Sequence, residues 1–93
     1  MRIQFKCFGP IRRALGTKLL DIEAEEGSTV GDIVDKVVEM GGEEVRDLVK
    51  PQGRISGNLI IMLNQKDVTT IGGVTTIVKE GDTVSLLPHV QGG

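Results

Sequence analysis

Hydrophobic and polar residues alternate along two stretches near the start of the chain, residues 2–8 and 20–24. Alternation with a period of two is typical of strands with one buried face. The inward positions are Ile3, Phe5, Cys7, Leu20, Ile22 and Ala24. Gly9-Pro10 is expected to end the first strand, and residues 11–18 are expected to form the loop that leads to the second.

The spacing of apolar residues then changes to that of a helix. Thr29 is expected to begin this helix as its N-cap, and Asp32 takes the place of the capping-box acid three residues later. The apolar stripe consists of Val30, Ile33, Val34, Val37 and Val38. Because β-branched residues are poor helix formers, packing against a sheet should hold this helix, and Gly41-Gly42 should end it.

The middle of the chain contains a second short helical turn and a strongly apolar segment. Residues 45–49 have helical spacing and are followed by Pro51, which should end the turn. Residues 52–57 are expected to form a loop. The continuous apolar run over residues 59–63 fits a strand that is buried on both faces.

The last third of the chain is expected to hold a short strand and a longer one. Residues 64–67 read as a polar turn, and Val68 is expected to begin a short edge strand. Residues 83–87 alternate again, with Val84 and Leu86 inward and Leu87 outward. Strand pairing should weaken at Pro88, which has no N–H to donate.

The order of these elements is strand, strand, helix, short helix, strand, short strand, strand. One main helix packed on a mixed sheet of four to five strands, with a short second helix, is an α+β arrangement. The order matches the β-grasp roll, the fold of ubiquitin. We therefore expect one domain over residues 1–88 and a flexible tail over residues 89–93.

Composition narrows the possible chemistry. The chain has 93 residues, a net charge of −2, one cysteine, one histidine and two aromatic residues. A single cysteine excludes a disulfide framework and a cysteine metal cluster, and Cys7 is expected to be a core thiol. His89 is expected to be a solvated tail residue, with no metal bound. Neither a basic stripe nor a long apolar segment is present, so we expect a cytoplasmic protein that binds neither nucleic acid nor membrane.

Four segments in the expected order resemble those of a known family. They are Phe8–Gly16, Thr29–Asp32, Leu63–Gln65 and Gly81–Gly93, the last of which ends in Gly-Gly. The chain is similar to the small archaeal modifier proteins, the small subunit of molybdopterin synthase and the thiamin sulfur carrier. Two positions depart from the family pattern: His89 stands where a second proline is usual, and Gln91 where a small residue is common.

The resemblance implies that the C-terminal carboxylate of Gly93 is the reactive group. An activating enzyme of the ubiquitin-activating type would adenylate it, using ATP and magnesium. The activated carboxyl group would then form an isopeptide bond with a target lysine, or a thiocarboxylate that supplies sulfur to the large subunit of molybdopterin synthase. Gly92 lacks a Cβ, so this end of the chain could enter a narrow channel. The chain itself would be a carrier or modifier rather than an enzyme, with no bound cofactor.

Five residues are candidates for docking to such a partner: Phe8, Arg12, Leu87, Pro88 and Val90. Phe8 and Leu87 could form an exposed apolar patch, although an outward leucine is commonly ordinary surface. Arg12 matches a family position. The alternative hypothesis is a β-grasp interaction module that binds through its sheet face and makes no use of the tail. An enzyme with its own site is not supported, because no nucleophile with a base, acid–base pair or phosphate loop is found.

Overall fold

A mixed five-stranded sheet forms the centre of the protein, with strand order β2-β1-β5-β3-β4. The computed structural model describes residues 1–88, so the predictions for His89, Val90, Gln91, Gly92 and Gly93 lie outside the described residues. The strands are β1 (Arg2–Cys7), β2 (Leu19–Glu23), β3 (Leu59–Leu63), β4 (Lys66–Asp67) and β5 (Thr83–Pro88). The helices are α1 (Gly9–Leu15) and α2 (Val30–Val49), with 3₁₀ turns η1 (Val68–Thr70) and η2 (Gly73–Thr75). The predicted α+β, β-grasp arrangement is confirmed.

The two alternating stretches near the start of the chain form β1 and β2, as predicted. β1 and β2 pair antiparallel, and their inward residues face each other, as in the pair Ile3↔Ile22. β5 lies between β1, to which it is parallel, and β3, to which it is antiparallel. Val84 and Leu86 on β5 are fully buried, as predicted. The buried inner side of the sheet therefore runs across β2, β1, β5 and β3.

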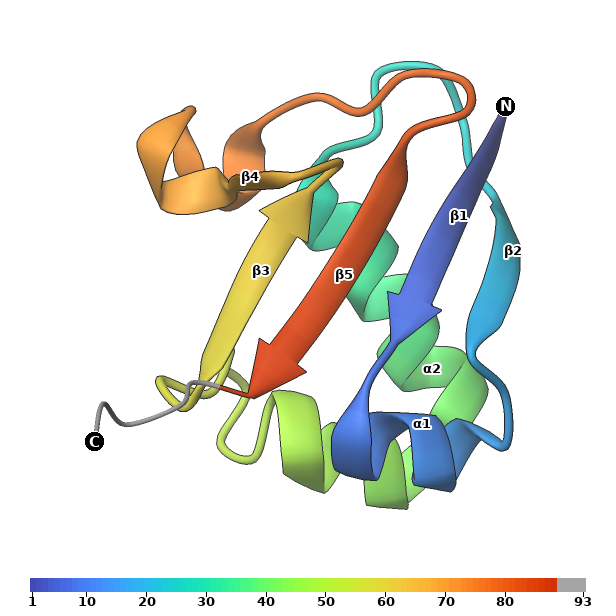
Figure 1. The fold of residues 1–93 in the computed structure, drawn as a ribbon, viewed down its shortest axis with the longest axis vertical. Coiled ribbons are helices and arrows are strands. Elements are labelled where there is room, and N and C mark those ends of the chain that lie inside the picture. Colours follow the sequence, from blue (N-terminus) through green and yellow to red (C-terminus); the bar gives the residue numbers. More distant parts are fainter. Residues whose placement is uncertain (89–93) are drawn as a thin grey trace.

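Helix α2 crosses the inner side of the sheet (Figure 1). Thr29 Oγ1 accepts from the backbone N–H of Asp32, whose carboxylate accepts from the N–H of Thr29 at 2.9 Å, so the predicted capping box is formed. The predicted apolar stripe is buried throughout. The backbone leaves helical geometry at Gly42 (φ 74°, ψ −156°), so α2 consists of two helical segments that meet at a kink. The predicted stop and the short second helix are both present.

Helix α1 is an element that the sequence reasoning missed. Residues 11–18 were expected to form a loop, whereas the chain is helical from Gly9 and ends at Leu15, with Gly16 as a left-handed C-cap (φ 73°). Pro10 stands in the first turn, where its missing N–H costs no intrahelical bond. Ile11 is buried, so tertiary packing stabilises a helix too short to persist alone.

Two predictions around β3 and β4 were wrong in detail. The run over residues 59–63 forms a strand, but Ile60 and Met62 on its outer side are only half-buried, because no helix in residues 1–88 covers that side. The edge strand is β4, which precedes Val68, and Val68 itself begins η1. Asn64 adopts a positive φ of 58° in the turn between β3 and β4, so the chain reverses earlier than the polar pattern suggested.

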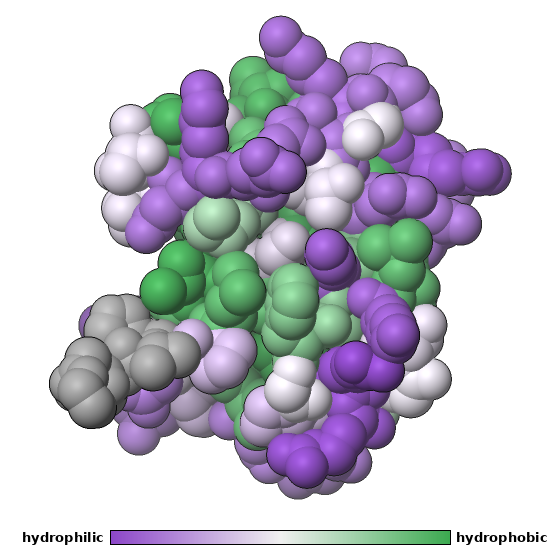
Figure 2. Space-filling model, viewed as in Figure 1, coloured by the Kyte–Doolittle hydropathy of each residue, from purple (hydrophilic) through white to green (hydrophobic). Residues whose placement is uncertain are grey.

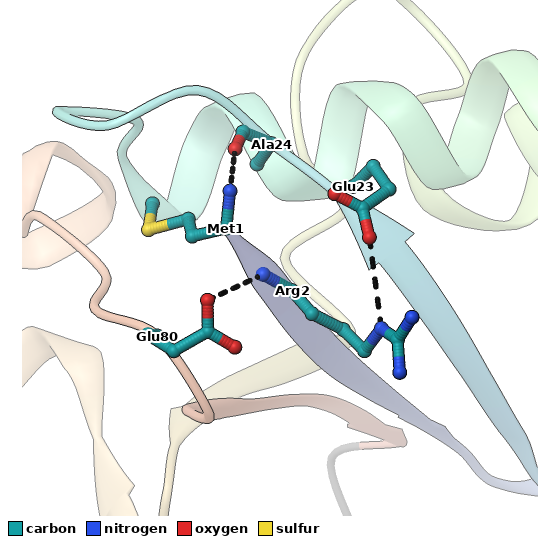
Figure 3. A network of polar contacts seen from close by, with 5 residues as sticks. All are labelled: Met1, Arg2, Glu23, Ala24 and Glu80. Carbon is teal, nitrogen blue, oxygen red and sulfur yellow. Dashed lines mark hydrogen bonds and ion pairs between the residues drawn. The ribbon is translucent and has the colours of Figure 1, made fainter.

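The start of β1 is held at the junction of three segments (Figure 3). The nitrogen of Met1 donates to the carbonyl of Ala24 at 2.7 Å, and the backbone N–H of Arg2 donates to Oε1 of Glu80 at 3.0 Å. Arg2 Nε lies 3.6 Å from Oε1 of Glu23. These contacts connect β1 to the end of β2 and to the turn before β5.

Candidate functional site

The end of β5 is the last described part of the chain, immediately before residues 89–93. Because β1 and β5 are parallel, their carboxyl ends meet at the same edge of the sheet, with Cys7 paired to Leu86. Phe8 follows β1 in an extended conformation (φ −132°), so it continues the strand alternation next to Leu87. Pro88 pairs with Leu59 as the last residue pair of the ladder. The tail therefore begins beside Phe8.

The outer side of the sheet carries an apolar surface that no helix in residues 1–88 covers. We call this surface the open face. Its apolar members are Phe8, Ile60, Met62 and Leu87, and it also includes Lys6 and Ser85, a nearly buried serine (5% exposed) between Lys6 and Met62. Figure 2 views this side and shows apolar side chains gathered over β3 and β5. Ile60 and Leu87 are register partners on adjacent strands, so the surface continues across both and ends where β5 ends.

The charged residues that line the hollow on this surface have one sign, although Asp67 is the cross-strand partner of Met62. A shallow hollow of about 800 Å³ on the open face is lined by two lysines, Lys6 and Lys66, and by no aspartate or glutamate. Nζ of Lys6 lies 5.5 Å from the ring centroid of Phe8, a cation–π geometry. Since the chain as a whole has a net charge of −2, the open face differs in sign from the rest of the molecule.

A second, smaller cleft of about 330 Å³ lies at the root of the tail. Phe8 and Pro88 contribute to it, together with Leu48 from the second segment of α2 and Pro51 after it. A Cβ on Gly9 would lie 3.9 Å from Cγ of Pro88, so the β1–α1 corner approaches the end of β5 closely. The second segment of α2 thus helps to shape the surroundings of Pro88.

The structure brings together three of the residues predicted to dock a partner, namely Phe8, Leu87 and Pro88. Arg12 is exposed on α1 and lines neither hollow. Val90 and the two terminal glycines, Gly92 and Gly93, lie outside the described residues. These roles remain predictions, because the geometry tests proximity and not binding.

Sequence reasoning missed Ile60, Met62 and Lys6 as members of the open face. Ile60 and Met62 were assigned to a strand buried on both sides. The signal that could have found them is the count of helices: one helical layer can cover only one side of a sheet. Their contiguity with Leu87 depends on the register of β3 with β5, which residue spacing does not specify.

Cys7, the only thiol, has the properties of a core residue, as expected. It is 3% exposed, and burial raises the pKa of its thiol, which disfavours the reactive thiolate. In the other direction, hydrogen bonds from the backbone N–H and the hydroxyl of Thr69 lower the pKa of Asp67. That carboxylate caps η1 and has a structural role.

Within residues 1–88, no group of three or more histidine, cysteine, aspartate or glutamate side chains is arranged to hold a metal ion. In the same part of the chain, no helix has both the length and the apolar character needed to span a bilayer.

The β-grasp topology, with an uncovered apolar sheet face beside the end of β5, defines a ubiquitin-like protein. The ThiS family model matches residues 5–93, and the chain belongs to this family. Small archaeal modifier protein 3 of Haloferax volcanii is 25% identical over 93 residues, with 100% of both chains covered. A putative sulfur carrier protein of Archaeoglobus fulgidus is 32% identical over 74 residues, covering 80% of this chain and 83% of the relative.

This chain is also similar to a protein of known structure. A chain in the crystal structure of the BexX/CysO complex of Amycolatopsis orientalis is 32% identical, with a TM-score of 0.70 and coverage of 98% of this chain and 99% of that one. The expected family and fold are confirmed. The chain is similar throughout to small ubiquitin-like modifiers and sulfur carriers.

Proposed function

We propose that the carboxylate of Gly93 is the group through which this protein acts, as a protein modifier, a sulfur carrier or both. The observation that carries the proposal is the match to the ThiS family over residues 5–93, which includes the terminal Gly-Gly. The fold supports it: the central strand of the sheet leads directly into the tail, so a rigid domain presents the last residues.

The chemistry starts from a poor electrophile, because a carboxylate has no leaving group. A partner enzyme with ATP and magnesium would join a carboxylate oxygen of Gly93 to the α-phosphorus, and pyrophosphate would leave. Hydrosulfide could then attack the acyl carbon, releasing AMP and a proton and leaving a thiocarboxylate. A lysine amine at the same carbon would give an isopeptide bond, again with release of AMP and a proton. Gly92 leaves room for the partner's backbone to approach.

The open face is the surface on which this adenylating enzyme would dock. It is continuous with the end of β5, so a protein bound there would lie next to the tail. Its apolar centre, which includes Met62 and Leu87, is flanked by Lys6 and Lys66, which favours a partner surface with an apolar centre and acidic groups opposite these two lysines. Possible acceptors are lysines of target proteins and the large subunit of molybdopterin synthase.

Activation can be tested with the full chain, the cognate adenylating enzyme, magnesium ATP and hydrosulfide. Intact mass should show replacement of one oxygen by sulfur, together with release of pyrophosphate. Deletion of Gly92-Gly93 should abolish both, while Gly57→Ala should have no effect, since a Cβ there meets no atom within 4 Å. Activity that survives the deletion would favour the tail-independent interaction module.

Docking is tested separately by Leu87→Asp. We expect the KM for this chain to rise about tenfold, which corresponds to roughly 1.4 kcal/mol of lost apolar contact, with a smaller change in kcat. Ile77→Asp is the matched control, because Ile77 is 57% exposed and lies outside the open face. Equal effects of the two substitutions on KM would refute docking at the open face.

A further inference from the structure

The outer edge of β2 is a free strand edge. β2 is the last strand on its side of the sheet, and among residues 1–88 it pairs with β1 alone. Two sets of hydrogen bonds show which residue pairs of β1 and β2 are hydrogen-bonded. One joins Met1 and Ala24, and the other runs from the N–H of Cys7 to the carbonyl of Lys18. In an antiparallel pair the bonded positions alternate, so the N–H and C=O of Asp21 and Glu23 point away from β1. Within residues 1–88, no hydrogen bond to these four groups is present.

A groove runs along this edge, between β2 and α2. Its volume is about 380 Å³, and its lining residues are Asp21, Ile22, Glu23, Lys36, Glu39 and Met40. Ile22 is buried at its base, whereas Met40 is 58% exposed on α2. An added strand would therefore find backbone partners on β2 and an apolar contact on the helix side.

The charges on the two sides of the β2 edge are mainly negative. On the helix side, the groove is lined by one carboxylate, Glu39, and one cation, Lys36. Asp21 and Glu23 alternate with the buried Ile22, so their carboxylates lie beside the same edge on the opposite side of the sheet. Glu23 also lies near Arg2 (Figure 3), but both side chains are more than 60% exposed, and such surface pairs contribute little. Glu23 can therefore exchange this partner for another cation.

We propose that the β2 edge binds an extended peptide in which basic and apolar residues alternate, as an additional antiparallel strand. Peptide residues opposite Asp21 and Glu23 would share their side of the sheet, so basic side chains there would form cross-strand ion pairs. The intervening residues would face the helix side and contact Met40, which favours apolar side chains. The β2 edge therefore favours a peptide in which basic and apolar side chains alternate residue by residue.

A second copy of this chain fits the edge poorly. Antiparallel pairing of two β2 edges would bring the carboxylates of Asp21 and Glu23 close to those of the other copy, and like charges opposite each other destabilise a sheet. Charged residues on edge strands are a known means of preventing such self-association. The same charges attract a basic strand. The β2 edge is separated from β3 by β1 and β5, so this binding is independent of activation at Gly93.

The test uses the full chain labelled with ¹⁵N and a capped peptide of alternating lysine and valine. Titration should shift the backbone amide signals of Asp21 and Glu23 more than those of Met62 and Leu87 on the open face. A peptide of alternating glutamate and valine should not bind. N-methylation of the lysine residues, whose N–H groups would face β2, should weaken binding about tenfold, whereas N-methylation of the valines should change it less than about threefold.

The charge requirement is tested with matched double variants. Asp21→Asn with Glu23→Gln should weaken binding about threefold to tenfold in low salt. Glu43→Gln with Glu44→Gln changes the net charge equally at exposed positions outside the groove and should leave binding unchanged. Equal effects of the two N-methylated peptides, equal effects of the two double variants, shifts centred on the open face, or β2-mediated dimers in sedimentation would each overturn the proposal.

Discussion

Gly41 lies next to the kink in α2, and Gly41→Ala tests how tightly this glycine is packed against Val45 and Leu15. A Cβ at residue 41 would overlap Cγ2 of Val45 and lie 2.6 Å from the Cβ of that residue. It would also lie 3.0 Å from Cδ2 of Leu15 on α1. These contacts are far inside van der Waals separation, so one of the neighbouring segments must move.

Two opposing effects determine the magnitude. Replacing glycine by alanine within a helix is favourable by about 1 kcal/mol, because alanine loses less backbone entropy. Inserting a methyl group into a filled space costs about 1–3 kcal/mol. Val45 is fully buried and has a stiff, β-branched side chain, so we expect the upper end of that range. The net effect should be a destabilisation of about 2 kcal/mol.

Urea unfolding followed by far-UV circular dichroism measures this free energy directly. For a domain of this size, 2 kcal/mol corresponds to a decrease in Tm of about 10 °C. Gly57→Ala is the control, because its Cβ meets no atom within 4 Å. A double-mutant cycle with Val45→Ala should show a favourable coupling, because removal of the valine methyl groups relieves the clash. A Gly41→Ala protein as stable as the wild type would show that the packing of Gly41 against Val45 and Leu15 is looser than these distances indicate.

Two further predictions concern local structure. Thr29→Ala removes the side-chain half of the capping box and should lower the free energy of unfolding by about 1 kcal/mol in the same urea assay, whereas Thr29→Ser should be nearly neutral; equal losses would refute the capping role. The folded pKa of Asp67 lies below its unfolded value, so its stabilisation of η1 is present above the unfolded pKa and is lost as the pH falls through the folded pKa. The amide proton of Thr69 should report this with an NMR titration midpoint below that of an unstructured aspartate, and a midpoint at or above that value would contradict it.

Local patterns predicted most of the elements correctly, because each depends on residues near one another in the chain. Strand alternation in β1, β2 and β5 follows from the period of side chains along an extended backbone. The start of α2 depends on Thr29 and Asp32, which are three residues apart and satisfy each other's backbone groups. The end of its first segment depends on glycine, since the backbone at Gly42 has a positive φ.

Elements stabilised by distant contacts were harder to predict. α1 has seven residues and a proline, and what holds it is burial of Ile11 against the rest of the fold. β4 has only two residues, and its extent depends on pairing with β3. The outer side of β3 was assigned to the core because five consecutive apolar residues do not indicate how many layers surround them.

The sequence by itself indicated the class of protein: the element order predicted the fold, and four segments that resemble the family, Phe8–Gly16, Thr29–Asp32, Leu63–Gln65 and Gly81–Gly93, predicted the family. Only the tertiary structure could define the surfaces. The open face exists because α2 covers one side of the sheet, and Phe8 lies beside Leu87 because β1 and β5 are parallel neighbours. The free groups of β2 follow from its place at the end of the strand order. Such surfaces depend on which distant segments become neighbours, and local residue patterns do not encode that.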